Sequence, residues 1–510
     1  MMNSLKNSSI MLLYFIATFI LSFIARTVFL NTLGVEYNGL SSLFSNILSM
    51  LSITELGIGS AIICHLYKPV AEDNIPMIQS LMGFYKKAYY LIALIMFIGS
   101  IICLPILPHI VGENTLPINI YVVFLLYALS SVSSYLFMYN RSIIVAHQKN
   151  YIITICDIGY KIVLNIVQII ILQKTKNYYL YLVIQIVCVL LNNIVVTQIA
   201  YIKYPYLKDR TKNKLPAEIL IDIKQKIKGL LFHKIAGFIV LGTDNILISR
   251  LCGLVTVGLY NNYYLIIGTI NNVIGQVLGS VTASIGNLIV TSKKEDIFVV
   301  YKKMSFLQYV IGTIVGVCIF NVSGPFISIW IGRQYLFSNG ILFVILLNNY
   351  LQNNRKVINA FKEAAGIYHE DRFIPIIESI INLIFSILFG IKFGLSGIFM
   401  GTIASTMILY IYSYPIIVYK RLFDKEIWSY YKEIITHLAL YLICFSCSFF
   451  LCERLQVASL FLQLIINLGI CIITCLGIYY VLFRKTMECQ FYISMFNSVI
   501  KKLFVRKNIT

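Results

Sequence analysis

Several charged side chains lie inside stretches of the sequence that are apolar enough to cross a membrane, and six of them stand out. A charge at the centre of a membrane helix costs roughly 2.5–3.5 kcal/mol on insertion scales, so such groups usually face a partner or a hydrated cavity. In those places they can form ion pairs, hold an anionic ligand, or carry a proton or cation. The candidates for this chemistry are Arg26, Glu55, Asp157, Lys161, Asp244 and Glu378.

Spacing predicts two pairings among these charges. Asp157 and Lys161 are four residues apart and share one helix face, where an ion pair would let the helix insert without net charge. Arg26 and Asp244 lie in the outer halves of the first and seventh apolar stretches. A contact between them would close the outer side of a central cleft. We therefore take Asp157 and Asp244 as candidates for gating or ion coupling.

Glu55, Glu378 and Arg355 also place polar groups in apolar stretches. Glu55 precedes Gly57 and Gly59, which weaken a helix and favour a bend. A carboxyl there could carry a proton, and a hydrogen-bonded structural glutamate is the alternative interpretation. Glu378 and Asp157 lie near the inner interface, where we expect simple hydration. Arg355 follows a run of Asn and Gln, and could line the inner mouth of a cavity or extend to lipid headgroups.

About fourteen apolar segments of roughly twenty residues would position these side chains. Each is long enough to cross a ~30 Å hydrocarbon layer as a helix. The chain is 59% hydrophobic and only 12% charged, which excludes a soluble globular protein of this size. We therefore predict an all-α integral membrane protein. The segments lie near 10–30, 40–63, 84–107, 118–140, 151–172, 178–201, 229–251, 257–290, 304–331, 338–361, 373–392, 396–419, 434–452 and 458–483.

The basic residues fix the expected orientation. With the N-terminus inside, only six of the 41 Lys and Arg residues fall in outward loops. By the positive-inside rule, both termini are cytoplasmic and the chain is a multi-pass protein of the bacterial inner membrane. Basic loops against the anionic leaflet then account for the net charge of +20, so we predict no nucleic-acid binding. The outward six are Lys174, Lys176, Arg250, Arg333, Lys392 and Arg454.

A central break and a weak repeat predict two halves. A shift of 219 positions places Gly34 on Gly253 and Gly39 on Gly258. Together with the basic break before residue 229, this repeat predicts two pseudo-symmetric six-helix bundles followed by two additional helices. The predicted parts are an N-terminal bundle (1–201), a basic cytoplasmic linker with an amphipathic helix (202–228), a C-terminal bundle (229–420), and two more membrane helices with a basic amphipathic tail (421–510).

The sequence contains no motif of a soluble active site. There is no Gly-rich phosphate loop, no G-x-S-x-G and no H-E-x-x-H. The six histidines are scattered, and the twelve cysteines lie mostly in apolar segments. We therefore predict no metal site and no cofactor. Outward loops are short, whereas an enzyme acting outside the membrane is expected to carry a larger one, so we predict a protein that is not an enzyme.

Four stretches carry a family resemblance: Arg26 with 33–40 (LGVEYNGL); 55–62 (ELGIGSAI) continuing into 66–73 (LYKPVAED); 366–368 (GIY) with 371–375 (DRFIP) and 381–383 (INL); and 393–398 (FGLSGI) with 401–402 (GT). They resemble lipid-linked oligosaccharide flippases, the Wzx-type polysaccharide exporters of the multidrug/oligosaccharidyl-lipid/polysaccharide superfamily. The stretches span both halves, and the first two are the more specific. The last two helices and the tail carry no matching motif.

The resemblance implies two bundles around a central cavity that alternates access. Such a protein would move an undecaprenyl-diphosphate-linked oligosaccharide to the outer leaflet, for O-antigen or capsule assembly. It would work beside membrane lipids, a polysaccharide polymerase and chain-length machinery. The resemblance also implies basic cavity residues for the anionic substrate. Of these, Arg26 lies in a matching motif, and we add Lys161 and Arg355 from their positions. A proton or Na⁺ is the hypothesis for the coupling ion, resting on Glu55 and Asp244.

The eighth apolar segment offers a hydrogen-bonding wall for such a substrate. Asn and Gln supply donors and acceptors, and tyrosine rings can stack on sugars. Ordinary polar packing between membrane helices is the alternative interpretation. The candidates for substrate binding on this segment are Asn271, Asn272 and Gln276.

Other classes of protein remain open at this point. A drug/cation antiporter of the same superfamily would share the fold, and a cavity of net negative charge would favour it. A cavity of net positive charge would favour a diphosphate lipid. A membrane polysaccharide polymerase or ligase would be supported by one long external loop. The buried charges disfavour a non-transporting partner of an assembly complex.

Overall fold

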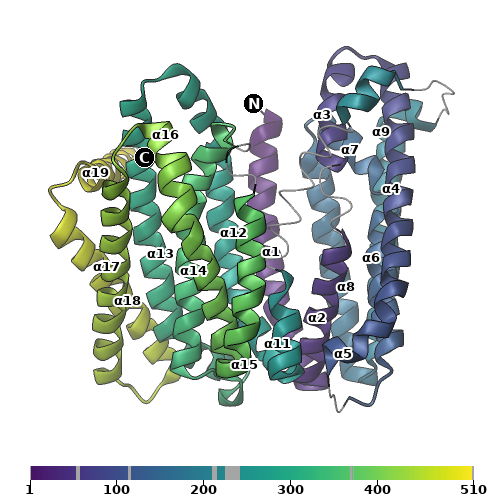
Figure 1. Ribbon diagram of the computed structural model, residues 1–510. Coiled ribbons are helices and arrows are strands. Elements are labelled where there is room, and N and C mark those ends of the chain that lie inside the picture. Colours follow the sequence, from purple (N-terminus) through teal and green to yellow (C-terminus); the bar gives the residue numbers. More distant parts are fainter. Residues whose placement is uncertain are drawn as a thin grey trace. The chain divides into compact units, whose positions relative to one another are not determined.

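A computed structural model describes residues 2–52, 58–112, 116–208, 215–223, 242–367, 370 and 373–507. All regular secondary structure in these ranges is helical, which confirms the predicted all-α class. The chain forms two compact units, Met1–Asn261 and Asn262–Thr510 (Figure 1). The four-part division with boundaries after residues 201, 228 and 420 stays a prediction.

The first unit is built from membrane-length helices and several shorter ones. Its described elements are α1 (Met2–Leu33), α2 (Val35–Leu51), α3 (Ile58–Ala71), α4 (Ile75–Cys103), η2 (Leu104–Ile106), α5 (Leu107–Val111), α6 (Ile120–Tyr135), α7 (Tyr139–Ala146), α8 (Asn150–Thr175), α9 (Tyr178–Lys203), η3 (Pro205–Lys208), α11 (Asp244–Cys252) and the beginning of α12 (Leu254–Thr291). Helix α1 packs on α8, α8 on α9, α9 on α6, and α6 on α4. Asn74, Asn119 and Asn177 begin α4, α6 and α9 by accepting first-turn N–H groups.

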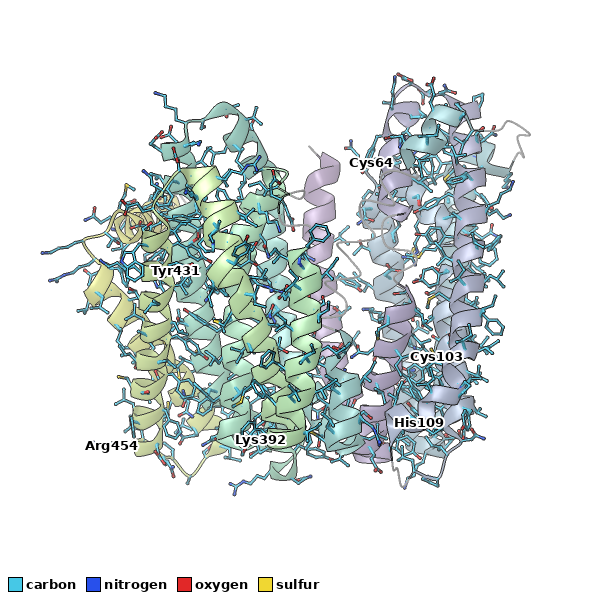
Figure 2. The ribbon with its side chains drawn as sticks, viewed as in Figure 1. Cys64, Cys103, His109, Lys392, Tyr431 and Arg454 are labelled. Atoms are coloured by element: carbon cyan, nitrogen blue, oxygen red, sulfur yellow. The ribbon has the colours of Figure 1, made fainter. Side chains whose placement is uncertain are left out.

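The second unit continues α12 and adds a further set of antiparallel helices. Its other elements are α13 (Lys294–Trp330), η4 (Arg333–Tyr335), α14 (Asn339–Ala364), α15 (Ile374–Ile408), η5 (Leu409–Tyr419), α16 (Lys420–Phe423), α17 (Ile427–Arg454), α18 (Leu460–Phe483) and α19 (Met487–Lys507). Helix α13 packs against α14, α17 and α18, and α14 packs against α15. Lys392 and Arg454, both predicted in outward loops, lie at the same end of this unit, and Tyr431 lies toward the other end (Figure 2).

Helix α15 consists of two helices that fold back on each other. Gly394 has φ +59° and ψ −136°, a conformation that ends one helix and starts the next. The two arms are then held by Asn382, whose Nδ2 donates to Thr402 Oγ1 at 3.1 Å, and by Ser386, whose Oγ donates to the Ile398 carbonyl oxygen at 3.0 Å. This turn separates the predicted segments 373–392 and 396–419.

Nine helices in the described part of the chain are long and apolar enough to cross a membrane. One of them, Ile374–Phe423, contains the turn at Gly394 and therefore represents two crossings. Each of the fourteen predicted segments falls at least partly on a described helix. The chain is thus a multi-pass membrane protein, as predicted.

The repeat predicted from the shift of 219 positions has a counterpart in the first unit. Gly34, between α1 and α2, has φ +95°, and Gly253, between α11 and α12, has φ +84°. Gly39 and Gly258 lie where α2 and α12 cross, and a Cβ on either would overlap backbone of the other helix. The repeated glycines therefore serve two purposes: one pair permits the left-handed turn, and the other permits the close crossing.

Candidate functional site

A break between α6 and α7 creates a polar site inside the first unit. Leu136 is extended and Phe137 has φ +66°, so carbonyls at the end of α6 lose their helical partners. Asn193 of α9 reaches them, and its Nδ2 donates to the carbonyl oxygens of Ser133, Ser134 and Leu136 at 3.1, 3.1 and 2.9 Å. A neighbouring amide thus supplies hydrogen bonds that lipid cannot supply.

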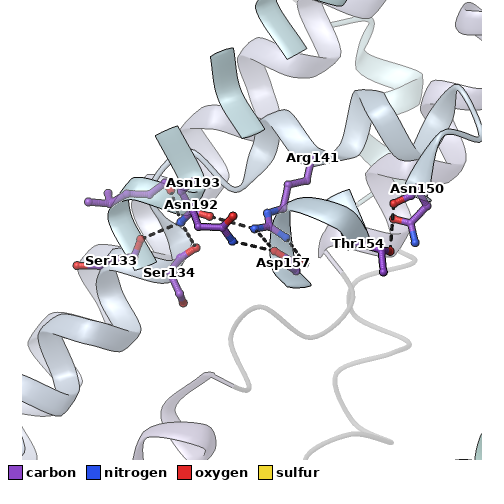
Figure 3. Close-up of polar contacts among 9 residues, drawn as sticks. Ser133, Ser134, Arg141, Asn150, Thr154, Asp157, Asn192 and Asn193 are labelled. Carbon is purple, nitrogen blue, oxygen red and sulfur yellow. Dashed lines mark hydrogen bonds and ion pairs between the residues drawn. The ribbon is translucent and has the colours of Figure 1, made fainter. Parts of the chain in front are cut away.

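Next to this break, Arg141 of α7 and Asp157 of α8 form an ion pair (Figure 3). Arg141 Nη1 donates to Asp157 Oδ2 at 3.0 Å, and Nη2 donates to Oδ1 at 2.9 Å. Asn192 Nδ2 also donates to Asp157 Oδ1, at 2.8 Å. The pairing is bidentate, which fixes the orientation of both side chains. The carboxylate is therefore fully engaged in this structure.

This ion pair lies in the wall of a pocket of about 300 Å³, which we call the arginine pocket. Two cations and one carboxylate among the lining residues give it a formal charge of +1. Tyrosine rings and amide groups complete the lining, so the pocket offers both stacking faces and hydrogen bonds. Residues that define it are Tyr14, Arg141, Asp157, Tyr160, Lys161 and Asn192. Such a lining suits an anionic ligand rich in hydroxyl groups.

The predicted ion pair between Asp157 and Lys161 is wrong in this structure. Arg141 takes the carboxylate, because its planar fork matches both oxygens at once. Lys161 lies instead with its Nζ 5.0 Å from the centroid of the Tyr14 ring on α1. Arg141 follows the predicted segment 118–140 and was expected in a cytoplasmic loop, so it was not among the candidates. The available signal was the polar Asn140 and Arg141 at the end of that segment.

Arg26 lies in a second polar cluster of the first unit, formed by α1, α2 and α12. It donates to Asn38 Oδ1, and Asn38 Nδ2 donates to the Gly258 carbonyl oxygen at 3.0 Å. With the Asn261 amide oxygen turned toward the guanidinium, that oxygen accepts from Arg26 Nη1 at 2.8 Å. The predicted pairing with Asp244 does not form here: Arg26 has no carboxylate within ion-pair distance among the described residues. Its charge is held by amides and is not neutralised.

The candidate carboxyls for ion coupling have different outcomes. Asp244 begins α11 and is buried, with 8% of its surface exposed. Its Oδ1 has no hydrogen-bond partner in the part of the chain that the structure describes. Glu55 lies outside the described residues.

The remaining candidates for substrate binding lie in the second unit. Asn271 Nδ2 donates to Asn349 Oδ1 at 2.7 Å, and Asn353 Nδ2 donates to Asn271 Oδ1 at 2.8 Å. Asn271 is thus part of an amide cluster between α12 and α14, whereas Asn272 and Gln276 are exposed.

Arg355 and Glu378 form a further ion pair in the second unit. Arg355 Nη1 lies 2.6 Å from Glu378 Oε1, and both side chains are largely buried, with 15% and 8% of their surfaces exposed. The expectation of a hydrated Glu378 is therefore wrong, because the arginine one helix away takes the place of water. In this structure the charge of Arg355 is neutralised.

Comparison with known proteins identifies a family for this chain and solved structures that share its fold. The model of the polysaccharide biosynthesis protein family matches residues 4–283, more than half of the chain. A search of curated proteins finds no match.

Solved structures with the same fold include a lipid II flippase and multidrug transporters. The lipid II flippase MurJ in an inward closed conformation is 14% identical, with 93% of this chain and 99% of that chain covered and a TM-score of 0.62. An inward-facing multidrug resistance MATE family transporter of the MOP superfamily is 14% identical, with 78% and 93% covered and a TM-score of 0.60. The Vibrio cholerae MATE transporter VcmN is 11% identical, with 84% and 99% covered and a TM-score of 0.51.

The fold is therefore that of a multi-pass membrane transporter. The chain belongs to the polysaccharide biosynthesis protein family, which confirms the resemblance found in the sequence.

Proposed function

We propose that this protein translocates undecaprenyl-diphosphate-linked oligosaccharide repeat units from the cytoplasmic to the outer leaflet of the bacterial inner membrane. Both termini are cytoplasmic in this proposal, and the product serves surface polysaccharide assembly, as O-antigen or capsule. A polysaccharide polymerase and its chain-length machinery would receive the repeat unit outside. The protein performs no covalent chemistry.

The observation that carries the proposal is the composition of the arginine pocket. Its formal charge of +1 suits a diphosphate, whereas the rival drug/cation antiporter requires a site of net negative charge. Arg26 adds a second positive charge that no described carboxylate balances. The tyrosine rings and amides of the same pocket suit the sugar.

The energetic need for such a site is large. A hydroxyl without a hydrogen bond costs about 4–8 kcal/mol in a medium that cannot supply one, and an unpaired diphosphate costs far more. A repeat unit carries many hydroxyls, so spontaneous transfer across the hydrocarbon layer is negligible. A transporter lowers this barrier by offering amides for the hydroxyls and cations for the diphosphate.

Transfer of a radiolabelled undecaprenyl-diphosphate oligosaccharide between leaflets of proteoliposomes tests the proposal. We expect protein-dependent transfer that falls about tenfold or more in Lys161→Met, because the arginine pocket loses one of its two cations and a hydrogen bond to a charged group contributes about 1.5–3 kcal/mol. Lys392→Met is the matched control, since Lys392 is exposed and also lies over an aromatic ring, with its Nζ 5.3 Å from the Phe393 centroid.

Each result has a distinct meaning. Transfer no faster than in empty liposomes, by folded protein, would reject the flippase and favour the antiporter, which cation-efflux assays would then reveal. Transfer that is equally slow in Lys161→Met and Lys392→Met would remove the arginine pocket from the substrate path. Unchanged transfer in Arg26→Ala would show that Arg26 does not lie on the substrate path.

For the driving force, we propose a proton or Na⁺ gradient acting through Asp244. This carboxyl is buried and has an oxygen without a described partner, which suits a group that binds and releases a cation. We expect Asp244→Asn to abolish the acceleration of transfer by an imposed pH or Na⁺ gradient while slow, gradient-independent transfer persists. A variant that still responds fully to both gradients would reject Asp244 as the coupling site.

A further inference from the structure

A second pocket in the first unit is strongly basic. It measures about 590 Å³ and lies among α4, α7, α9 and η3. Lys86, Lys87 and Lys208 line it, and none of its described lining residues is Asp or Glu. Lys86 Nζ lies 5.7 and 5.9 Å from the ring centroids of Tyr90 and Tyr139, so this ammonium group is positioned over aromatic faces. We call this cavity the lysine pocket.

Hydrogen bonds tie the helices around the lysine pocket to each other, and a glycine leaves the space between them open. Gln79 Nε2 donates to the Tyr206 carbonyl oxygen at 2.6 Å and ties η3 to α4. Asn140 Nδ2 donates to Thr197 Oγ1 at 3.1 Å and ties α7 to α9. Gly83 faces the pocket, and a Cβ built there meets nothing within 4 Å. The space is therefore part of the architecture of this unit.

An apolar stripe on α4 continues from the lysine pocket. Lys87, Leu91, Leu94 and Ile98 follow helical spacing, and the three apolar side chains expose 57%, 53% and 47% of their surfaces. From Lys87 to Ile98 the helix rises about 16 Å at 1.5 Å per residue. That length matches one leaflet, about half of a ~30 Å hydrocarbon layer. The stripe thus has the length and chemistry of a contact for an acyl chain.

We propose that the lysine pocket binds the phosphate headgroup of an anionic phospholipid, whose acyl chains lie along the exposed stripe of α4. Three lysines without a lining carboxylate supply the charge, and the tyrosines at the rim suit the membrane interface. The adjoining stripe favours a lipid over free phosphate, which has no use for an apolar surface. This site is separate from the arginine pocket, and the inference does not depend on the transported substrate.

Native mass spectrometry of the full chain, titrated with cardiolipin or phosphatidylcholine, tests the proposal. We expect the protein to bind cardiolipin tightly and phosphatidylcholine weakly. In Lys86→Ala/Lys208→Ala the affinity for cardiolipin should fall about 25-fold, since each lysine near the membrane surface contributes about fivefold. The matched control is Lys303→Ala/Lys425→Ala. These lysines also lie over rings, with Nζ to centroid distances of 4.0 Å for Phe491 and 5.5 Å for Phe298, and they are outside the pocket.

A second variant keeps all three lysines and fills the open volume of the lysine pocket. Gly83→Leu places a side chain into the open pocket and improves helix propensity, so the protein should fold and cardiolipin binding should be lost. Equal losses in the two double-lysine variants, or full binding by Gly83→Leu, would overturn the site. Inorganic pyrophosphate that binds wild type as tightly as cardiolipin would show that phosphate, and not a lipid, is the ligand.

Discussion

The Arg141–Asp157 ion pair gives the sharpest test of the structure, because the sequence alone favours a different partner. The test is a pair of double-mutant cycles in which Asp157→Asn is combined with Arg141→Gln or with Lys161→Met. A charged hydrogen bond contributes about 1.5–3 kcal/mol, and two join Arg141 to Asp157.

Solvent and the third bond to Asp157 reduce the coupling between the two side chains. Arg141 and Asp157 expose 19% and 26% of their side-chain surfaces. Asn192 also donates to the carboxylate, and this bond remains when Arg141 is replaced. We therefore expect a coupling of about 2 kcal/mol for Arg141 with Asp157, within the range that contacting residues show. Lys161 with Asp157 should give about 0.5 kcal/mol or less, the value of an ordinary i,i+4 pair.

The measurement is the free energy of unfolding in mixed micelles, titrated with SDS and followed by far-ultraviolet circular dichroism. Lys161 is the internal control, since it lies one turn from Asp157 on the same helix. A coupling of Lys161 to Asp157 that equals or exceeds that of Arg141 would refute the assignment. It would also mean that α7 does not present Arg141 to the arginine pocket.

Three further outcomes follow from single positions. Gly258→Ala should prevent the close crossing of α2 and α12 and sharply reduce the yield of monodisperse protein, whereas Gly275→Ala, on the same helix with open space around its Cβ, should not. Gly394→Ala should lower the free energy of unfolding by about 1–2 kcal/mol, because φ +59° is strained for alanine; an unchanged SDS midpoint would contradict this. Glu378→Gln leaves Arg355 buried without its carboxylate and should cost about 3 kcal/mol, measured by the same titration, and a cost below that of Asp157→Asn would argue against the burial described.

The helices of this protein could be predicted because lipid permits few alternatives. Apolar runs of about twenty residues must be helical in a membrane, and even the tight turn at Gly394 coincides with the gap between the segments 373–392 and 396–419. The internal repeat was visible in a few matched positions, of which the four glycines are identical pairs. It proved informative because Gly39 and Gly258 are constrained by backbone contact and not by hydrophobicity.

The partners of charged side chains could not be predicted in the same way. Helical spacing finds neighbours on one helix, so it proposed Lys161 for Asp157, and no comparable rule finds Arg141 on the helix before it. Asn271 was expected to face a substrate, and it bonds to Asn349 and Asn353 on α14. Such contacts depend on how helices rotate against each other, which the one-dimensional pattern leaves undetermined.

Helix α7 is only eight residues long, and its two sides belong to different pockets. Tyr139 and Asn140 line the lysine pocket, and the next residue, Arg141, lines the arginine pocket. Thermodynamic linkage makes any coupling through this helix reciprocal: a ligand that alters affinity across α7 by some factor has its own affinity altered by the same factor. If the two pockets bind their proposed ligands and are coupled through α7, the lipid composition of the membrane is an effector of substrate binding, and the substrate in turn selects which lipids bind the protein.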